Sequence, residues 1–383
     1  MPRVLLIFGT RPEAIKLAPV VRRLRQWPER FETRIAATAQ HRQMLDQVLD
    51  AFSIRPDYDL DLMRPGQSLC GSTSRILSAL EDVLKQERPD CVLVQGDTTT
   101  AFTGALSAFY LNIPVGHVEA GLRSGDRRQP FPEEMNRVLV GRLASLHFAP
   151  TTEAAENLKR EGASPGDIFV TGNTGIDAVL EIRDALEAGA LQSPDGPALD
   201  RRKKLILVTA HRRESFGEGF ASICSALARL ASRGDAEIVY PVHPNPNVRD
   251  PVNRLLRGVT GIHLIDPLPY VRFVDLMRKA HVLLTDSGGI QEEGPSLGKP
   301  VLVMREKTER PEAVAAGTAR LVGVSADRIV RETALLLEDR AEYERRSLLH
   351  NPYGDGHAAE RIREILDARL ASRAAKTGAA SIS

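Results

Sequence analysis

The sequence predicts an α/β protein with two doubly wound domains, and three observations lead to this prediction. Short apolar runs, typical of strands covered on both faces, alternate with amphipathic helical stretches along most of the chain. Such alternation produces right-handed βαβ units and a parallel sheet. The rhythm is interrupted at 187–204 by a stretch rich in Gly, Pro and charge, and 383 residues suit two or three domains of roughly 150 residues each.

The first domain is predicted to span 1–171. Its opening strand, VLLIFGT at 4–10, is followed by a helix whose apolar residues include Ile15, Val20 and Leu24. The remaining apolar runs predict strands at 33–39, 91–97, 113–120, 146–150 and 168–172, and the segments between them predict helices at 41–52, 68–87, 98–110 and 132–145.

The second domain is predicted to span 172–356, where the same alternation restarts. Its strands are expected at 205–211, 237–242, 262–267, 281–287, 300–304 and 319–324. A last helical segment, 357–372, precedes residues 373–383, which we expect to be disordered.

The composition restricts the class of protein. Hydrophobic residues make up 42% and charged residues 26%, and the net charge of +1 gives no argument for nucleic acid or a membrane surface as a partner. Three widely spaced cysteines predict buried or half-buried thiols in a reducing compartment, without a disulfide framework or a structural zinc site. No run approaches the roughly 20 apolar residues of a membrane span, and no signal peptide is evident, so we expect a cytoplasmic protein.

Ionisable side chains gather where the predicted strands end. In open parallel sheets, ligands bind at the carboxyl ends of the strands, near a switch in strand order. Two such domains facing each other would form a cleft from two sets of strand ends. The polar residues expected there are Arg11, Asp97, His117, Glu119, His211 to Glu214, His243, Ser287 to Gly289 and Arg305.

The stretch TDSGGIQEE at 285–293 is the most informative glycine signal. Two glycines before a helix suit a phosphate cradle, although a plain strand–helix turn also uses glycine. Glu292 and Glu293 lie one turn into that helix, where a carboxylate can bind ribose hydroxyls or simply favour the helix dipole. Neither a GxGxxG fingerprint after the first strand nor a Walker A motif is present, which argues against a nicotinamide enzyme or a P-loop ATPase.

Four carboxylates at the rim of the first sheet are candidates for proton transfer. Asp97 and Glu119 lie at the ends of predicted strands, and Glu133 and Glu134 lie near the start of a predicted helix. Each has a plainer alternative, and Asp97 in particular can cap the helix that begins near residue 98. The HRRE stretch at 211–214 is an anion-binding candidate, and the histidines show no metal-ligand spacing, so no metal is expected.

Long motifs run along most of the chain: FGTRPEAIKLAP (8–19), QHRQMLDQ (40–47), QGDTTT (95–100), HVEAGLRSGD (117–126), PFPEEMNR (130–137), HRRESFGEGF (211–220) and TDSGGIQEEGPSLGKPVLVMREKTERPEAV (285–314). With these motifs, in this order, the chain resembles the non-hydrolysing UDP-N-acetylglucosamine 2-epimerase family of bacteria over about 1–365. The resemblance implies a glycosyltransferase-B architecture, with two Rossmann-like domains, an active site in the interdomain cleft and the helix 357–372 joined to the first domain.

The resemblance also implies a reaction. The family interconverts UDP-N-acetylglucosamine and UDP-N-acetylmannosamine by eliminating UDP to give 2-acetamidoglucal and adding it back, with no cofactor and no metal. The catalytic residues that match this sequence are Asp97, Glu119, Glu133 and His211, the last as a charged imidazole that helps UDP leave. The matching substrate-binding residues are Arg11, Lys16, Phe273 (at the uracil), Ser287, Gly288, Gly289, Glu293 (at the ribose) and Arg310, which leaves Glu292 a structural role.

Regulation and assembly are further expectations from the resemblance. Relatives bind a second UDP-N-acetylglucosamine as an activator, and Gln40 and Gln43 match that site, although Pro65–Gly66 replaces a charged pair found in some relatives. Leu268 stands where relatives can carry Gln near the base. Relatives are commonly homodimers. A hydrolysing epimerase, a UDP-sugar glycosyltransferase of the same architecture and a non-catalytic nucleotide-sugar sensor are the alternatives.

Overall fold

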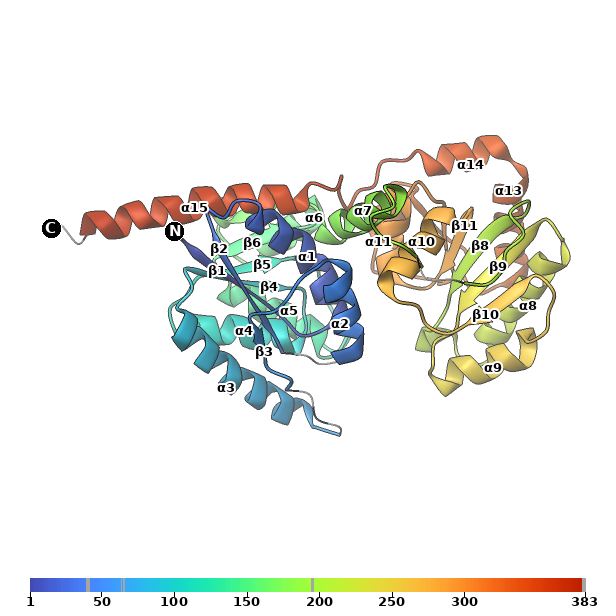
Figure 1. Ribbon diagram of the computed structural model, residues 1–383. Coiled ribbons are helices and arrows are strands. Elements are labelled where there is room, and N and C mark those ends of the chain that lie inside the picture. Colours follow the sequence, from blue (N-terminus) through green and yellow to red (C-terminus); the bar gives the residue numbers. More distant parts are fainter. Residues whose placement is uncertain (39–41, 63, 65, 194–195, 381–383) are drawn as a thin grey trace. The chain divides into compact units, whose positions relative to one another are not determined.

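The computed structural model describes residues 1–38, 42–62, 64, 66–193 and 196–380. The chain forms two compact units, which Figure 1 shows: unit 1 comprises Met1–Ala178 and Tyr353–Ser383, and unit 2 comprises Val179–Pro352. The division falls within α7 (Thr174–Glu187) and not at residue 171. The start of α7 stays with unit 1 because the Asp177 carboxylate accepts the backbone N–H groups of Ala358 and Ala359 at 3.2 and 2.8 Å.

Unit 1 contains a parallel sheet in the order β3-β2-β1-β4-β5-β6-β7. Six of its strands confirm the predictions from the apolar runs, although they are up to a few residues shorter than predicted. The edge strand β3 was not predicted, because two residues carry no periodic signal. The strands are β1 (Arg3–Phe8), β2 (Glu32–Ala37), β3 (Tyr58–Asp59), β4 (Cys91–Gln95), β5 (Val115–Val118), β6 (Leu146–Ala149) and β7 (Ile168–Val170).

Local signals explain where the helices of unit 1 begin. A capping box joins Thr10 and Glu13 at the start of α1, and the side chains of Ser68, Thr98 and Thr151 cap α3, α4 and α6. The helices are α1 (Arg11–Arg25), α2 (Arg42–Ala51), α3 (Leu69–Glu87), α4 (Thr99–Tyr110), α5 (Glu133–Leu143), α6 (Thr152–Arg160) and α15 (Ala358–Ala380), together with the start of α7.

The last helix, α15, packs against α1 and forms the ion pairs Arg23–Glu360 and Arg30–Asp367 (Figure 1). Its bounds run to Ala380, and the expectation that 373–383 is disordered stays a prediction. Residues 381–383 lie outside the described part of the chain.

Unit 2 contains a parallel sheet in the order β10-β9-β8-β11-β12-β13. All six strands confirm the predicted runs, and their buried side chains form the unit's core with α8, α9 and α13. The strands are β8 (Lys204–Thr209), β9 (Ala236–Pro241), β10 (Ile262–Ile265), β11 (Val282–Thr285), β12 (Val301–Val303) and β13 (Ala319–Leu321).

The helices of unit 2 follow its strands in the βα rhythm. They are α8 (Glu218–Ser232), α9 (Pro246–Leu256), α10 (Tyr270–Lys279), α11 (Gly288–Ser296), α12 (Pro311–Ala315), α13 (Ala326–Glu338) and α14 (Arg340–Ser347). Within the described ranges of both units, no helix has the length and apolar character needed to cross a bilayer. Of the three cysteines, Cys91 and Cys224 are buried as predicted, whereas Cys70, near the start of α3, is exposed.

Candidate functional site

The strand order of unit 1 reverses between β1 and β4, so a ligand is expected at the carboxyl ends of these two strands. Glu13 connects them. Its carboxylate accepts the N–H groups of Gly9 and Thr10 at 3.1 and 2.7 Å and the hydroxyl of Thr98 at 2.6 Å. Only 1% of Glu13 is exposed, and this burial raises the pKa of its carboxyl group. The contacts fix the loop that leads to Arg11, the first residue of α1.

Asp97 lies just beyond the end of β4. Its carboxylate forms an ion pair with Arg137 of α5, and its backbone carbonyl accepts a hydrogen bond from Asn136 Nδ2 at 2.9 Å. The sequence left open whether Asp97 caps α4, but the structure gives that role to Thr98. The Asp97 side chain is 29% exposed, so a ligand can reach it while Arg137 holds it in place.

Glu119 lies just beyond the end of β5, the strand next to β4. Its backbone has φ 65°, a left-handed conformation that is uncommon for a residue other than glycine and that clusters at functional sites. Its carboxylate forms an ion pair with Lys16 of α1, and the two side chains are only 10% and 15% exposed. The structure therefore brings together two predicted site residues, and it places Asp97 and Glu119 at the ends of neighbouring strands.

The start of α5 carries the other two predicted carboxylates. Glu133 is the first residue of the helix and is half-buried. Glu134 is buried, and its carboxylate accepts the N–H groups of Ser124 and Gly125 at 3.0–3.1 Å. Glu134 also lies 3.5 Å from Arg137, the partner of Asp97. The sequence reasoning missed Arg137, although its position one helical turn after Glu133 and Glu134 places it on the same face of α5.

His117 lies within β5 and does not reach the rim. It is fully buried, and its Nε2 lies 2.8 Å from the carbonyl oxygen of Gly96, the residue before Asp97. Burial lowers the pKa of His117 to about 3, so the ring is neutral at physiological pH. His117 therefore supports the turn that carries Asp97, and it is not an ionisable group of the site.

The strand order of unit 2 reverses between β8 and β11, and Asp286 connects the ends of these strands. Asp286 is completely buried, and its Oδ2 accepts the N–H groups of His211 and Arg212 at 2.6 and 2.7 Å. Its Oδ1 lies 3.3 Å from Nδ1 of His211. The sequence reasoning passed over Asp286, although it immediately precedes the predicted cradle. The carboxylate fixes the backbone of the predicted catalytic histidine, and its Oδ1 faces the ring.

The protonation of His211 in the ligand-free protein depends on burial and on three neighbouring groups. Burial lowers the pKa of His211, and nearby Arg212 and His243 oppose its charge, while Asp286 favours it. The ring of His243 stacks on that of His211 with centroids 5.5 Å apart. In the ligand-free protein the lowered pKa of His211 favours the neutral ring near pH 7.

The predicted phosphate cradle is the start of α11. Ser287 is the N-cap residue, and Gly288 and Gly289 are the first two helical residues, whose N–H groups have no acceptor within the helix. A Cβ on Gly289 would lie 3.9 Å from Oε1 of Glu293. Glu293, the residue predicted to bind the ribose, therefore lies beside the cradle. A Cβ on Gly288 would lie 3.7 Å from Cζ of Arg310, which places that guanidinium over the helix start.

Glu292 has a role different from that of Glu293. It is buried, and its carboxylate forms an ion pair with Nε of Arg310. The backbone carbonyl of Glu292 accepts a hydrogen bond from Asn351 Nδ2 at 2.7 Å. The N–H of Arg310 donates to Thr308 Oγ1 at 3.1 Å. Together these contacts fix the guanidinium of Arg310 above the cradle.

The remaining predicted residues are only partly placed. Phe273 is half-buried near the start of α10, and Leu268 is half-buried in the loop before that helix. Gln40, predicted for the activator site, lies outside the described residues, and for Gln43 only the backbone position in α2 is described.

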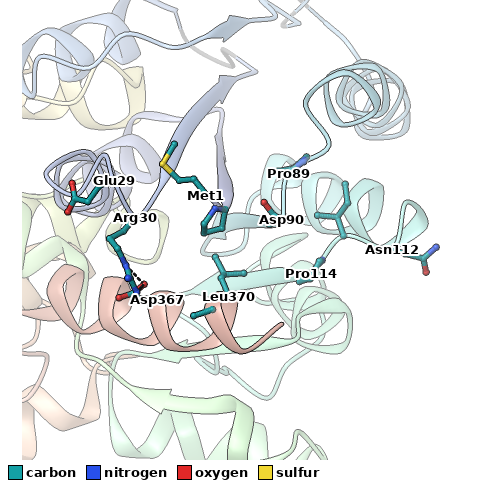
Figure 2. Close-up of a pocket in the computed structure, with 12 residues that line it drawn as sticks. Met1, Glu29, Arg30, Pro89, Asp90, Asn112, Pro114, Asp367 and Leu370 are labelled. Carbon is teal, nitrogen blue, oxygen red and sulfur yellow. Dashed lines mark hydrogen bonds and ion pairs between the residues drawn. The ribbon is translucent and has the colours of Figure 1, made fainter. Parts of the chain in front are cut away.

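A cavity of about 540 Å³ in unit 1 has none of these residues in its lining. Figure 2 shows that it is lined by residues that precede the strands, among them Met1, Asp90 and Pro114, and by Asp367 and Leu370 of α15. These are the amino ends of β1, β4 and β5, the edge of the sheet opposite Asp97 and Glu119. Size alone therefore does not identify the functional site.

Comparison with protein families and curated sequences gives a consistent result. A family model described as UDP-N-acetylglucosamine 2-epimerase matches residues 22–367. The UDP-N-acetylglucosamine 2-epimerase of Escherichia coli (strain K12) is 58% identical over 369 residues, which is 95% of this chain and 98% of that protein. The Yersinia pestis protein of the same name is 56% identical over 373 residues, 95% of this chain and 98% of its own.

Solved structures agree in fold. The UDP-GlcNAc 2-epimerase from Neisseria meningitidis bound to UDP-GlcNAc is 49% identical, with a TM-score of 0.86 over 95% of this chain and 99% of that chain. The Methanocaldococcus jannaschii enzyme in complex with UDP-GlcNAc and UDP is 34% identical, with a TM-score of 0.75 over the same shares. The glycotransferase of kitacinnamycin, at 14% identity and a TM-score of 0.61 over 95% and 98%, shows the fold alone.

Proposed function

Since the chain belongs to the UDP-N-acetylglucosamine 2-epimerase family, we propose that it interconverts UDP-N-acetylglucosamine and UDP-N-acetylmannosamine without net hydrolysis. The observation that carries the proposal is the pair of carboxylates Asp97 and Glu119 at the ends of neighbouring strands, each held by a basic side chain. Paired carboxylates are suited to moving a proton off and onto a carbon atom.

The proposed reaction is an elimination followed by an addition. The C2 proton of the sugar is not acidic enough for simple removal and return. A carboxylate therefore takes the proton while the C–H electron pair forms the C1–C2 double bond. The C1–O bond breaks, and UDP leaves with that bond's electron pair, giving 2-acetamidoglucal. Protonation of C2 on the other face and addition of UDP to C1 complete the epimerisation. Asp97, Glu119 and Glu133 are the proposed acid and base groups.

Unit 2 is proposed to bind UDP. The N–H groups of Gly288 and Gly289 suit the diphosphate, whose charge they stabilise as it departs. The guanidinium of Arg310 suits binding of the same group, in the UDP-sugar and in UDP alike. Glu293 suits the ribose hydroxyls, and Phe273 the uracil. His211, neutral in the free protein, gains a proton as the diphosphate charge comes near and then stabilises leaving UDP.

Product analysis separates this proposal from its alternatives. Purified protein is incubated with UDP-N-acetylglucosamine, and the mixture is followed by anion-exchange chromatography. We expect a stable mixture of two UDP-sugars. Stoichiometric UDP with free N-acetylmannosamine would identify a hydrolysing enzyme. Binding without any conversion would contradict epimerisation and favour a transferase or a sensor.

A further inference from the structure

A second basic site lies at the edge of the unit 2 sheet. Four arginines from three elements line a cavity of about 380 Å³: Arg320 of β13, Arg328 of α13, and Arg345 and Arg346 of α14. The rest of its wall is small or apolar, including Val314 and Gly317. None of these residues belongs to the proposed epimerisation site.

The most unusual residue of the cavity is Arg346, whose charged side chain is buried. The residue is 6% exposed, and its Nε donates to Glu342 at 2.6 Å. Its Nη2 lies 3.6 Å from Oε2 of Glu332, too far for a hydrogen bond. Both Nη1 and Nη2 are buried, and neither has a hydrogen-bond partner among the described residues. A buried guanidinium with unsatisfied donors is unfavourable unless an acceptor completes it.

The cavity also has an excess of positive charge. Glu332 is shared by Arg320 at 2.9 Å, Arg331 at 3.6 Å and Arg346. The other carboxylate, Glu342, is shared by Arg345 and Arg346, and these hydrogen bonds lower the pKa of Glu342 to about 2. Arg328 donates to the carbonyl of Leu321 at 2.7 Å and has no carboxylate partner among the described residues.

Protection of an exposed sheet edge explains only part of this arrangement. Charged side chains on an edge strand prevent pairing with another chain, and Arg320 on β13 can serve that purpose. That purpose requires exposed charges, and it does not account for the burial of Arg346 or for the cavity in front of it. An anion with several oxygen acceptors accounts for both, because arginine binds phosphate groups in a fork geometry.

We propose that this arginine cavity binds a diphosphate group, either free or as part of a nucleoside diphosphate. The cavity is larger than a single phosphate requires, and its guanidinium groups come from three elements, so they can bind the oxygen atoms of two linked phosphate groups from several directions. The site is separate from the N-terminus of α11, so the protein binds diphosphate at two places.

Equilibrium dialysis of the full chain with radiolabelled inorganic pyrophosphate tests this proposal. The variants are Arg328→Gln and Arg345→Gln, because both side chains are exposed and their removal leaves the buried Arg346 in place. The control is Arg340→Gln, which removes one exposed arginine from the same helix outside the cavity. We expect two pyrophosphates per wild-type and control chain, and at least a tenfold weaker second site in both cavity variants.

These binding measurements test the proposal without reference to enzymatic turnover. The proposal would be overturned if the wild-type chain bound only one pyrophosphate. It would also be overturned if the Arg340→Gln control weakened the second site as much as the cavity variants do. Displacement of pyrophosphate from the second site by UDP would identify a nucleoside diphosphate as the ligand, and resistance to UDP would identify the free diphosphate. A circular-dichroism melting curve for each variant checks that its fold is retained.

Discussion

Asp97 and Glu119 are held by cations that come from different helices, Arg137 of α5 and Lys16 of α1. Each carboxylate lies beyond the end of a strand and is thereby oriented by a residue of a helix. Sequence motifs identified both acids and Lys16, because all three fall in long stretches with a recognisable order. Arg137 and Asp286 also fall in such stretches, but their roles were not predicted, because these roles depend on the residues that they contact in the folded chain.

The first prediction concerns the two carboxylates. We expect Asp97→Asn and Glu119→Gln each to lower turnover by roughly 100- to 10,000-fold, because each removes a proton-transfer group. UDP affinity should stay close to that of the wild type, as calorimetry can show. Glu153→Gln, an exposed acid of α6 paired with Arg160, is the control and should retain full activity. Near-wild-type turnover in either site variant would remove that residue from the chemistry.

The second prediction concerns Glu292 as a positioning residue. Replacing it with Gln removes the ion pair that orients Arg310, so we expect KM for the UDP-sugar to rise roughly tenfold with little change in kcat. Steady-state kinetics give the two constants separately. Glu338→Gln, which loses the exposed ion pair to Arg233 in the same unit, should change neither. A purely structural Glu292 would lower the melting temperature and leave KM unaltered.

The third prediction concerns protonation. Because burial lowers the pKa of His211 below 6.5 in the free protein and a diphosphate charge raises it, UDP binding at pH 7 should take up a fraction of a proton. The measurement is calorimetry in buffers with different ionisation enthalpies. Proton uptake should disappear in His211→Asn and persist in the control His350→Asn, since His350 is exposed outside the site. Equal uptake in both variants would place the proton elsewhere.

At the scale of elements, the structure confirms most of what the apolar runs predicted. Twelve predicted strands are present, because a run buried on both faces is visible in sequence. The helix at the cradle is present and includes both glycines, beginning at Gly288. The strand that was not predicted, β3, is too short to have a period. The acids of α11 fall in its second turn, and the burial of Glu292 against Arg310 was not visible in the pattern.

The start of α11 gives the fourth prediction. A Cβ at Gly288 would meet its nearest neighbour at 3.4 Å, which is ordinary contact, so Gly288→Ala should fold and melt at or slightly above the wild-type temperature. The added methyl group narrows the approach to the cradle, so UDP affinity should fall roughly tenfold. Gly219→Ala, in the first turn of α8 with neighbours no nearer than 3.6 Å, is the matched control. Unchanged UDP affinity in Gly288→Ala would show that phosphate does not approach this turn.

At the scale of the whole molecule, the two units share one sheet topology and one way of joining two strand ends. Each has a parallel sheet whose order reverses beside its first strand, and a buried acid joins the two strand ends at that point: Glu13 in unit 1 and Asp286 in unit 2. The alternation of the sequence predicted both sheets and the strand ends at which the site is proposed. It did not predict these connecting acids, because a buried acid has the same sequence signature as an exposed one.

The most direct test of elimination at C2 is proton NMR of the protein with UDP-N-acetylglucosamine in heavy water. The proposed mechanism predicts UDP-N-acetylmannosamine that carries deuterium at C2, with the pool of UDP-sugar largely intact, because the returning proton comes from the solvent. Epimer that retains its original C2 hydrogen would contradict that mechanism.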